Sequence, residues 1–371
     1  MKRRQDPGSF SRWLRKNWSR LRRLTIGIVL CGAAVGSWYS MGLYRQRQAV
    51  EAMIAGRYEE REGSAAEAAA PEPSDEDFQF NDTVTWQGKT YRKNHYIKAV
   101  LCIGVDRSGS MLEPTLSGDG GQADGVFLLA QDTARNSLKI LLIPRDSMTE
   151  ITQTDTSWTD DNGKVLGKIT DHLSLAYSYG DGMETSCQYT AEAVSHLLAG
   201  LPIDAYMSAD TDVIAVLNDM VGGVSVMIPT MGMEKIDPSF VLGETVRLQG
   251  EQAEAFVRFR DITIDNSAIT RMEQQKAYIR GFFQSVKETS RSNSRIVEEL
   301  FEAVQDHMIT DMAKDEYLKI AVDMLEGEGL MSGSFRMVPG TGTATETYDE
   351  FYVDKEALIP VLLDLFYREV P

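Results

Sequence analysis

The sequence holds few of the residues that mark disulfide-linked, collagenous or disordered chains. Its 371 residues include only 3 Cys and 11 Pro, and 43% of them are hydrophobic. Three cysteines cannot build a disulfide framework. A bridge between Cys102 and Cys187 is conceivable, although buried free thiols are favoured. The composition excludes a mainly disordered or collagenous chain and allows a large folded core.

The motifs of the common hydrolases are also missing. The 4 His are scattered without metal-ligand spacing, and no G-x-S-x-G, Walker A or H-E-x-x-H pattern occurs. Serine-triad and zinc chemistry therefore lack support. The glycine-rich segment PGTGTA (339–344) is not followed by the helix that a phosphate loop requires, so we predict a turn there.

Positive charge is scarce after residue 47. Residues 1–47 hold 11 Lys and Arg against one acid, which leaves 27 of the 38 basic and 54 of the 55 acidic residues for the rest. An acidic body is poorly suited to wrap nucleic acid, because phosphate neutralisation requires a basic face. We therefore expect no nucleic-acid partner, and we expect any bound anion to be held by a few arginines.

An apolar run without a charge extends from Leu24 to Tyr44. It is long enough to cross a hydrocarbon core of roughly 30 Å as a helix, and longer than the apolar part of a cleaved signal peptide. Most nearby Lys and Arg precede it, so the positive-inside rule predicts a cytoplasmic N-terminus. The sequence predicts a single-pass protein of the cell membrane whose main domain is extracellular.

The composition of the residues after Tyr44 indicates further segments of the chain. The Ala/Glu/Pro-rich stretch SAAEAAAPEPSDED is typical of a solvated spacer. We predict a basic cytoplasmic segment (1–23), a transmembrane helix (24–44), a stalk (45–80), a catalytic domain (81–290) and a C-terminal elaboration packed on that domain (291–371).

Apolar runs and helical periodicity alternate in the predicted domain. The sequence predicts a hairpin around Gly88, buried strands over 97–105, 125–131 and 138–144, and helices that include 190–199 and 269–289. This alternation is typical of an α/β (α+β) fold with a central mixed sheet flanked by helices.

Charged side chains follow several of these strands directly. Asp106 ends the strand 97–105, Asp124 lies among glycines beside the next strand, and Arg145 with Asp146 follows the third. Sheets of this class place their sites at strand ends. Two carboxylates suit Mg²⁺, and an arginine suits phosphate oxygens. The alternatives are turn-forming aspartates and a structural Arg–Asp pair.

A second group of candidates lies later in the chain. Arg258 and Arg260 point about 200° apart on a helix, so both reach one ligand only if the helix ends near Val257. Arg271 and Gln275 share one face of the helix 269–289.

That face opens toward Phe282 and Phe283, which suits an amphiphile, although an ordinary surface-to-core helix has the same pattern. Lys168 adds one more cation, which is a weak signal alone.

Eight short segments follow one another in a fixed order over residues 95–290. They are LCIGVD, QADGVFLLAQD, ILLIPRDSM, KIT with LAYSYG, GLPIDAYM, DMVGGVSVMIP, LQGEQAEAFVRFRD and RMEQQ. Taken in this order, they resemble the motifs of the LytR–CpsA–Psr family. That resemblance implies a phosphotransferase that moves a glycopolymer, such as teichoic acid or capsule polysaccharide, from a polyprenyl-pyrophosphate carrier to a peptidoglycan hydroxyl.

The same resemblance implies roles for single residues. Asp106 and Asp124 are expected to hold Mg²⁺, and an apolar channel beside Phe282 and Phe283 is expected to take the prenyl tail. The expected catalytic residues are Asp106, Arg145 and Asp146, with Asp106 or Asp146 as base, and the expected pyrophosphate ligands are Arg145, Lys168, Arg258, Arg260, Arg271 and Gln275.

The chain departs from the family pattern at two positions. Gln122 and Gln274 stand where the family usually has arginine. Two expected cations are therefore missing from the predicted site.

Two non-catalytic alternatives stay open. DRSGSM (106–111) matches the metal site of a von Willebrand A-type adhesion domain, in which Asp106, Ser108 and Ser110 bind Mg²⁺. That site requires a helix immediately afterwards, which Pro114 and the following glycines oppose. A protein that binds the lipid carrier without transferring its polymer is the second alternative.

Overall fold

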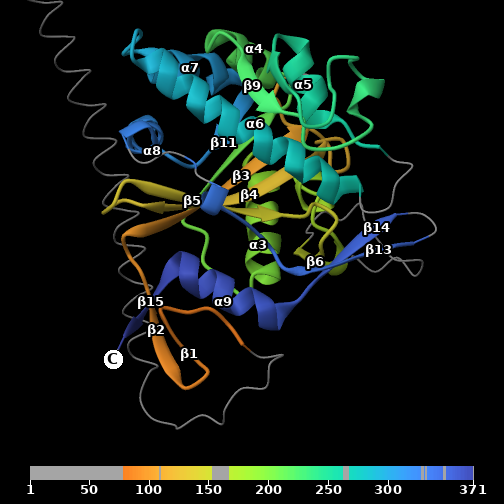
Figure 1. Ribbon diagram of the computed structural model, residues 1–371. Helices are drawn as coiled ribbons and strands as arrows, with labels where there is room; N and C mark the ends of the chain where they lie inside the picture. The colour runs from red at the N-terminus through yellow and green to blue at the C-terminus, as the bar shows by residue number, and fades with distance from the viewer. Residues whose placement is uncertain are drawn as a thin grey trace, which may run out of the picture. The chain divides into compact units, whose positions relative to one another are not determined.

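The computed structural model describes residues 78–107, 110–152, 167–261, 267–326, 330, 332–345 and 348–370 (Figure 1). The predicted transmembrane run and most of the predicted stalk lie outside these residues. Among the described helices, none is both long and apolar enough to cross a membrane.

A six-stranded mixed sheet forms the centre of the fold, as the sequence predicts. β3 pairs antiparallel with β4 and parallel with β8, and both edge strands come from residues after 290. β3 is buried on both faces, which explains its unbroken apolar run. The strand order is β11 (Met308–Thr310), β8 (Ala205–Asp210), β3 (Ile97–Asp106), β4 (Gln122–Asp132), β5 (Ser137–Ile143) and β12 (Phe335–Met337).

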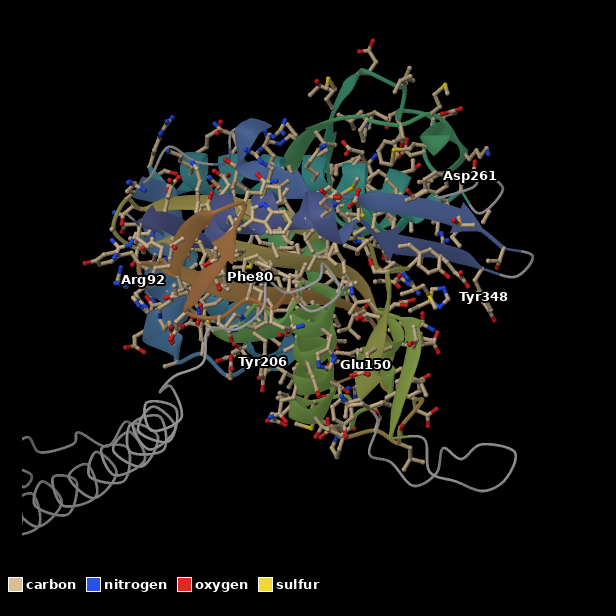
Figure 2. The ribbon with its side chains drawn as sticks, turned by 90° about the horizontal axis from the view of Figure 1, so that it is seen from below. Phe80, Arg92, Glu150, Tyr206, Asp261 and Tyr348 are labelled. Atoms are coloured by element: carbon tan, nitrogen blue, oxygen red, sulfur yellow. The ribbon has the colours of Figure 1, made fainter. Side chains whose placement is uncertain are left out.

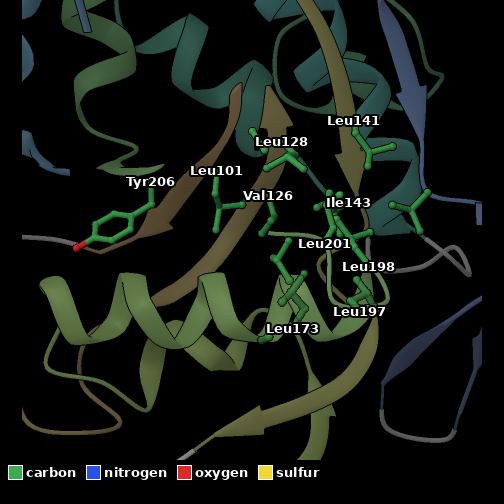
Figure 3. Close-up of a cluster of buried hydrophobic side chains, with 14 of the residues drawn as sticks. Leu101, Val126, Leu128, Leu141, Ile143, Leu173, Leu197, Leu198, Leu201 and Tyr206 are labelled. Carbon is green, nitrogen blue, oxygen red and sulfur yellow. The ribbon is translucent and has the colours of Figure 1, made fainter. Parts of the chain in front are cut away.

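Helices cover both faces of this sheet (Figure 1). Leu101 and its same-face neighbours pack against α3 (Glu184–Leu197) and α9 (Lys355–Phe366). Figure 3 shows the side of this contact at α3, with Leu101, Val126 and Ile143 on the strands and Leu197 and Leu198 at the end of the helix. Each such buried leucine contributes about 2 kcal/mol. Val100 and Cys102 point to the other face, toward α6 (Ser267–Ser290) and α8 (Lys314–Glu326).

A second apolar cluster lies on the far side of α6. It contains Phe240 and Phe256, whose rings meet edge to face at 5.7 Å, and Phe282, which stacks on Tyr278. The elements that enclose it are α4 (Val213–Met220), β9 (Val224–Met227), η1 (Met233–Lys235), β10 (Thr245–Leu248), α5 (Glu251–Arg258) and α7 (Ile296–Val304).

Besides the antiparallel pair β9–β10 of the second apolar cluster, three small sheets complete the described fold. The predicted hairpin around Gly88 is confirmed, and it pairs with the last strand of the chain. The sheets are β1 (Thr83–Trp86), β2 (Lys89–Lys93) and β15 (Tyr367–Val370); β6 (Met148–Thr152) and β7 (Lys168–His172); and β13 (Gly340–Ala344) and β14 (Asp349–Val353). Short helices are α2 (Leu175–Ser178), η2 (Gln305–His307) and η3 (Ser332–Ser334).

The predicted turn over 339–344 is wrong, because residues 340–344 form strand β13. A Cβ at Gly340 would lie 2.3 Å from the carbonyl oxygen of Tyr352 on the paired strand. This glycine therefore serves close strand packing and does not mark a turn.

The helix predicted over 190–199 begins earlier, at Glu184. Asp181 explains this start, because its carboxylate accepts hydrogen bonds from Met183, Thr185 and Ser186. Cys102 and Cys187 are buried free thiols, as favoured from the sequence. Burial raises the pKa of the Cys187 thiol to about 12, so this thiol stays protonated and inert at neutral pH.

Candidate functional site

A β-bulge brings Asp106 and Asp124 to one edge of the central sheet. Gly104 pairs with Gly125 and Val105 pairs with Ala123, so Asp124 is the extra residue between two regular pairs. A bulge bends its strand and redirects the side chain of the inserted residue. The carboxyl end of β3 and the start of β4 therefore bring Asp106 and Asp124 to the same edge of the sheet.

Two arginines hold Asp124. Arg145 contacts one carboxylate oxygen and also donates from Nη2 to Gln122 Oε1 at 2.6 Å and to Ser174 Oγ at 3.0 Å. Arg271 donates to the other oxygen at 2.8 Å and to the Asp124 carbonyl at 3.2 Å. Both guanidinium groups are largely buried. Asp124 is thus the central acceptor of the site.

The loop after β5 fixes the next pair, Arg145 and Asp146. The backbone N–H of Ser174 donates to the Arg145 carbonyl at 3.0 Å, and the N–H of Phe351 donates to the Asp146 carbonyl at 2.8 Å. Asp146 is buried, and one of its oxygens lies 3.2 Å from Arg145 Nε. Strand β14 and the segment before α2 therefore lock this loop in place.

Helix α5 ends at Arg258, one residue after Val257, where the sequence predicts the helix must end if Arg258 and Arg260 are to reach one ligand. Phe259 adopts an extended conformation (φ −55°, ψ 128°). Arg258 consequently reaches Asp106 at 2.6 Å, while Arg260 reaches Asp349 at 3.1 Å and Asp146 at 3.6 Å. One helix end therefore sends two guanidinium groups into the same cluster.

Arginines and aspartates alternate through the whole cluster, four of each. Outside these eight, the Glu254 carboxylate accepts a hydrogen bond from Arg258, and this contact raises the pKa of Arg258. Burial lowers the pKa of Arg271, and the Asp124 carboxylate opposes this shift. Arginine keeps its charge in either case. The eight residues are Asp106, Asp124, Asp146, Asp349, Arg145, Arg258, Arg260 and Arg271.

The LytR_cpsA_psr family model matches residues 57–362. The chain belongs to this family. The family resemblance that the sequence motifs predict is thereby confirmed.

Relatives of the family have related names and folds. Two proteins named polyisoprenyl-teichoic acid–peptidoglycan teichoic acid transferase TagU are similar. TagU of Enterococcus faecalis is 27% identical over 72% of this chain and 78% of its own length, and TagU of Bacillus subtilis is 24% identical over 72% and 76%. The crystal structure of B. subtilis TagV shares the fold, with a TM-score of 0.55 and 22% identity over 73% of this chain and 97% of that chain.

The two departures from the LytR–CpsA–Psr pattern have structural explanations. Gln122 accepts a hydrogen bond from Arg145, where a second arginine would place two like charges together. Gln274 lies on α6, where its side chain is buried against the end of α5. With its amide nitrogen facing the helix end, it donates to the carbonyls of Phe256 and Phe259 and accepts from Thr230. Gln274 therefore supports the segment that carries Arg258 and Arg260.

Gln275, which the family resemblance implies to be a pyrophosphate ligand, lies beside the β-bulge of β4. Its amide nitrogen would be 3.5 Å from a Cβ built on Gly125. This distance is an ordinary van der Waals contact, so the Gln275 amide packs directly over this glycine of the bulge. Gln275 is thus placed next to Asp124, as a further polar group of the cluster.

The structure does not place Lys168 in this cluster. Lys168 lies at the far end of the hairpin β6–β7, opposite Thr152, and its ammonium donates to Glu150 at 2.6 Å. This ion pair raises the pKa of Lys168 and lowers that of Glu150. Phe282 and Phe283 are half-buried on α6, where Phe282 packs against the second apolar cluster.

The adhesion-domain alternative is not supported by the chain after Asp106. Within the described residues 110–121 there are turns and no helix. Arg107 is buried and donates to the carbonyls of Glu113 and Gly182, which ties this loop to the start of α3. Ser108 lies outside the described residues.

Two contributors to the site were not anticipated from the sequence. Asp349 comes from β14 and holds Arg260, and Ser174 precedes α2 and holds Arg145. Neither follows an apolar strand or belongs to a charged motif, so no local pattern marks them. Their role depends on the docking of distant segments.

The described residues contain no group of three or more His, Cys, Asp or Glu side chains that could hold a metal ion together. Asp106 and Asp124 are the two carboxylates that would be available to Mg²⁺, which commonly takes one or two carboxylates together with water and substrate phosphates. Their oxygens contact Arg258, Arg145 and Arg271 in this structure.

Proposed function

We propose that this chain is a membrane-anchored phosphotransferase of the LytR–CpsA–Psr family, with its main domain outside the cell. It moves a glycopolymer from a polyprenyl-pyrophosphate carrier to a hydroxyl of the cell wall. The names of the TagU relatives support teichoic acid as the polymer and peptidoglycan as the acceptor. The apolar run 24–44 supports the anchor.

The alternating arrangement of four arginines and four aspartates carries this proposal. Without ligand, the two sets neutralise each other. A diphosphate diester and Mg²⁺ carry opposite charges of equal size, so their joint entry adds no net charge. The arginines would then contact phosphate oxygens in place of their aspartate partners. Asp106 and Asp124 would contact the metal ion in place of their arginine partners.

The reaction is a displacement at phosphorus. The acceptor oxygen forms a bond to the phosphorus that carries the polymer, and the bond from that phosphorus to the bridging oxygen breaks. The leaving group is the prenyl phosphate, and the hydroxyl proton passes to a carboxylate. Arg145, Arg258, Arg260 and Arg271 stabilise the charge that develops on the phosphate oxygens.

Asp106 and Asp146 are the two candidate bases. Asp106 is half-exposed at the end of β3, where an acceptor can reach it. Asp146 is buried between Arg145 and Arg260, where it orients both guanidinium groups. We assign proton removal to Asp106 and the positioning of the arginines to Asp146.

Asp106 and Asp124 would hold Mg²⁺, which supplies Lewis-acid neutralisation of the phosphate oxygens. The prenyl tail would extend from the arginines along α6 toward Phe282 and Phe283, beside the second apolar cluster. In this proposal the polar headgroup lies at the arginines and the apolar tail lies beside Phe282 and Phe283.

The test is transfer by the full chain in liposomes that contain a labelled glycan on polyprenyl pyrophosphate, with Mg²⁺ and peptidoglycan. Label is expected to appear on peptidoglycan, with prenyl phosphate as the second product. Arg145→Ala is expected to abolish both signals. Arg135→Ala, which removes an exposed arginine paired with Asp132, serves as the control.

Tight binding of the carrier with no prenyl phosphate released by the wild-type chain would refute the enzyme. That outcome would favour the carrier-binding alternative.

A further inference from the structure

The last residue of β9 and the segment that connects β9 to β10 expose several large apolar side chains. Met231 is 77% exposed and Met227 is 61% exposed. Figure 2 shows the segment standing out from the edge of the described fold, with the labelled Asp261 at its base. We call the following five side chains the apolar tip: Met227, Met231, Ile236, Val241 and Leu242.

The apolar tip is held by a structured base. Met233 and Phe240, from the same segment, are fully buried in the second apolar cluster. Asp237 accepts hydrogen bonds from the backbone and hydroxyl of Ser239 and from the amide of Gln252. The base therefore holds the exposed apolar side chains in a fixed conformation. Their exposure to water is unfavourable, and contact with another apolar surface would remove them from water.

The segment also borders the arginine cluster. Lys235 donates to Asp261 at 2.7 Å, and Thr230 contacts Gln274, which supports the end of α5. Asp261 directly follows Arg260. The apolar tip thus belongs to the same structural unit as the residues that we propose to bind the carrier's diphosphate.

We propose that the apolar tip inserts into the interface of the lipid bilayer and guides the carrier from the membrane to the arginine cluster. This inference rests on the proposed function. The chain's own apolar run ends at Tyr44, and the 33 residues before Phe78 span at most roughly 110 Å, so the tip can reach the membrane.

The charges around the tip identify the kind of lipid contact. Glu234, Asp237 and Glu244 outnumber Lys235 in this segment. An acidic loop gains nothing from anionic headgroups, so its attachment depends on apolar burial. Binding should therefore be insensitive to salt and should occur on zwitterionic vesicles as well as anionic ones.

The first experiment measures depth with a nitroxide label on the full chain in phosphatidylcholine liposomes. The chain carries Cys31→Ser, and its other two cysteines are buried. Met231→Cys is the test site. Tyr96→Cys is the control, because Tyr96 is 59% exposed just before β3, at the end of the strand opposite Asp106.

We expect the label at position 231 to collide with dissolved oxygen more than with a water-soluble nickel chelate, at low and high salt. The label at position 96 should show the reverse. Equal exposure of both labels to the chelate would overturn the proposal. Dipolar broadening between labels at 231 would overturn it in favour of a contact between two copies of the chain.

The second experiment separates the membrane role from the transfer chemistry. The triple variant Met231→Ser, Val241→Ser, Leu242→Ser changes exposed side chains only. It should lose transfer from a long-chain donor in liposomes several-fold and keep transfer from a short-chain, water-soluble donor. Tyr352→Ser, at an exposed position on β14, should affect neither.

If the triple variant kept the wild-type rate of transfer from both donors, or lost the same fraction of the rate with each, the guiding role would be contradicted. Absence of transfer in the wild-type chain would refute the proposed function, while the depth measurement would still test insertion.

Discussion

The inner and outer halves of the arginine cluster differ in burial and in number of partners. In the inner half, Arg145 and Arg271 share Asp124, and the Arg271 side chain is only 6% exposed. In the outer half, Arg258 pairs with Asp106, and the Arg258 side chain is 42% exposed.

A buried pair becomes costly when one partner is lost, because the other charge stays desolvated. An exposed pair contributes little to stability. The ion pairs of the inner half should therefore contribute more to the free energy of unfolding than the Arg258–Asp106 pair of the outer half.

Arg271→Met should have the largest effect. It leaves Asp124 with a single guanidinium partner in a buried position, so the free energy of unfolding should fall by about 3 kcal/mol. Urea unfolding measures this change. Arg258→Met, the same substitution in the outer half, is the matched control and should stay within about 1 kcal/mol of wild type. Equal losses in the two variants would abolish the distinction between the halves.

Arg258→Ala should separate activity from stability. The variant loses a charge-assisted contact to phosphate worth about 1.5–3 kcal/mol, which corresponds to roughly 10-fold to 100-fold slower transfer. Its unfolding midpoint should match that of wild type. Slow transfer accompanied by a large loss of stability would show that the outer half is structural as well.

Asp349→Asn tests the contribution of the C-terminal segment. Asp349 does not face the proposed ligand directly but holds Arg260 at 3.1 Å, so we regard it as a positioning residue. Loss of this charge weakens the hydrogen bond that orients Arg260, which is worth about 1 kcal/mol. Transfer should therefore become about threefold to tenfold slower. Asp349→Glu should restore part of the rate, which a purely structural defect would not allow.

The adjacent substitution Glu350→Gln is the control for Asp349→Asn. The Glu350 carboxylate accepts a hydrogen bond from the Tyr352 hydroxyl and contacts no arginine of the cluster. Transfer by this variant should equal that of wild type. Similar losses from both variants would point to a general disturbance of β14.

Lys168→Ala should have the smallest effect. Lys168 is exposed and pairs with Glu150, and exposed pairs contribute at most about 1 kcal/mol. Transfer rate and carrier affinity should both stay within about twofold of wild type. A loss comparable to that of Arg258→Ala would return Lys168 to the pyrophosphate ligands that the family resemblance implies.

The sequence allowed the central sheet and much of the site to be predicted, because both leave local signals. Apolar runs mark β3, β4 and β5. The spacing of Arg258 and Arg260 lets both reach one ligand only if the helix ends near Val257, and the observed helix ends one residue later. The bulge at Asp124 leaves no such signal, because it depends on how two strands pair.

The role of Asp349 was hidden for a related reason. It lies in a hairpin whose glycines suggest a turn, and its partner Arg260 is 89 residues earlier in the chain. Long-range docking cannot be read from local periodicity. Lys168 shows the opposite case, in which a motif suggests a site residue and the register of β6–β7 places it elsewhere.

Calorimetric titration of the full chain with a polyprenyl diphosphate and Mg²⁺ tests most directly whether the arginines form one diphosphate site. Arg145 and Arg258 come from segments more than a hundred residues apart. We predict that Arg145→Ala and Arg258→Ala each weaken binding at least about tenfold, while Arg135→Ala binds as wild type does. Unchanged affinity in the two cluster variants would contradict the account.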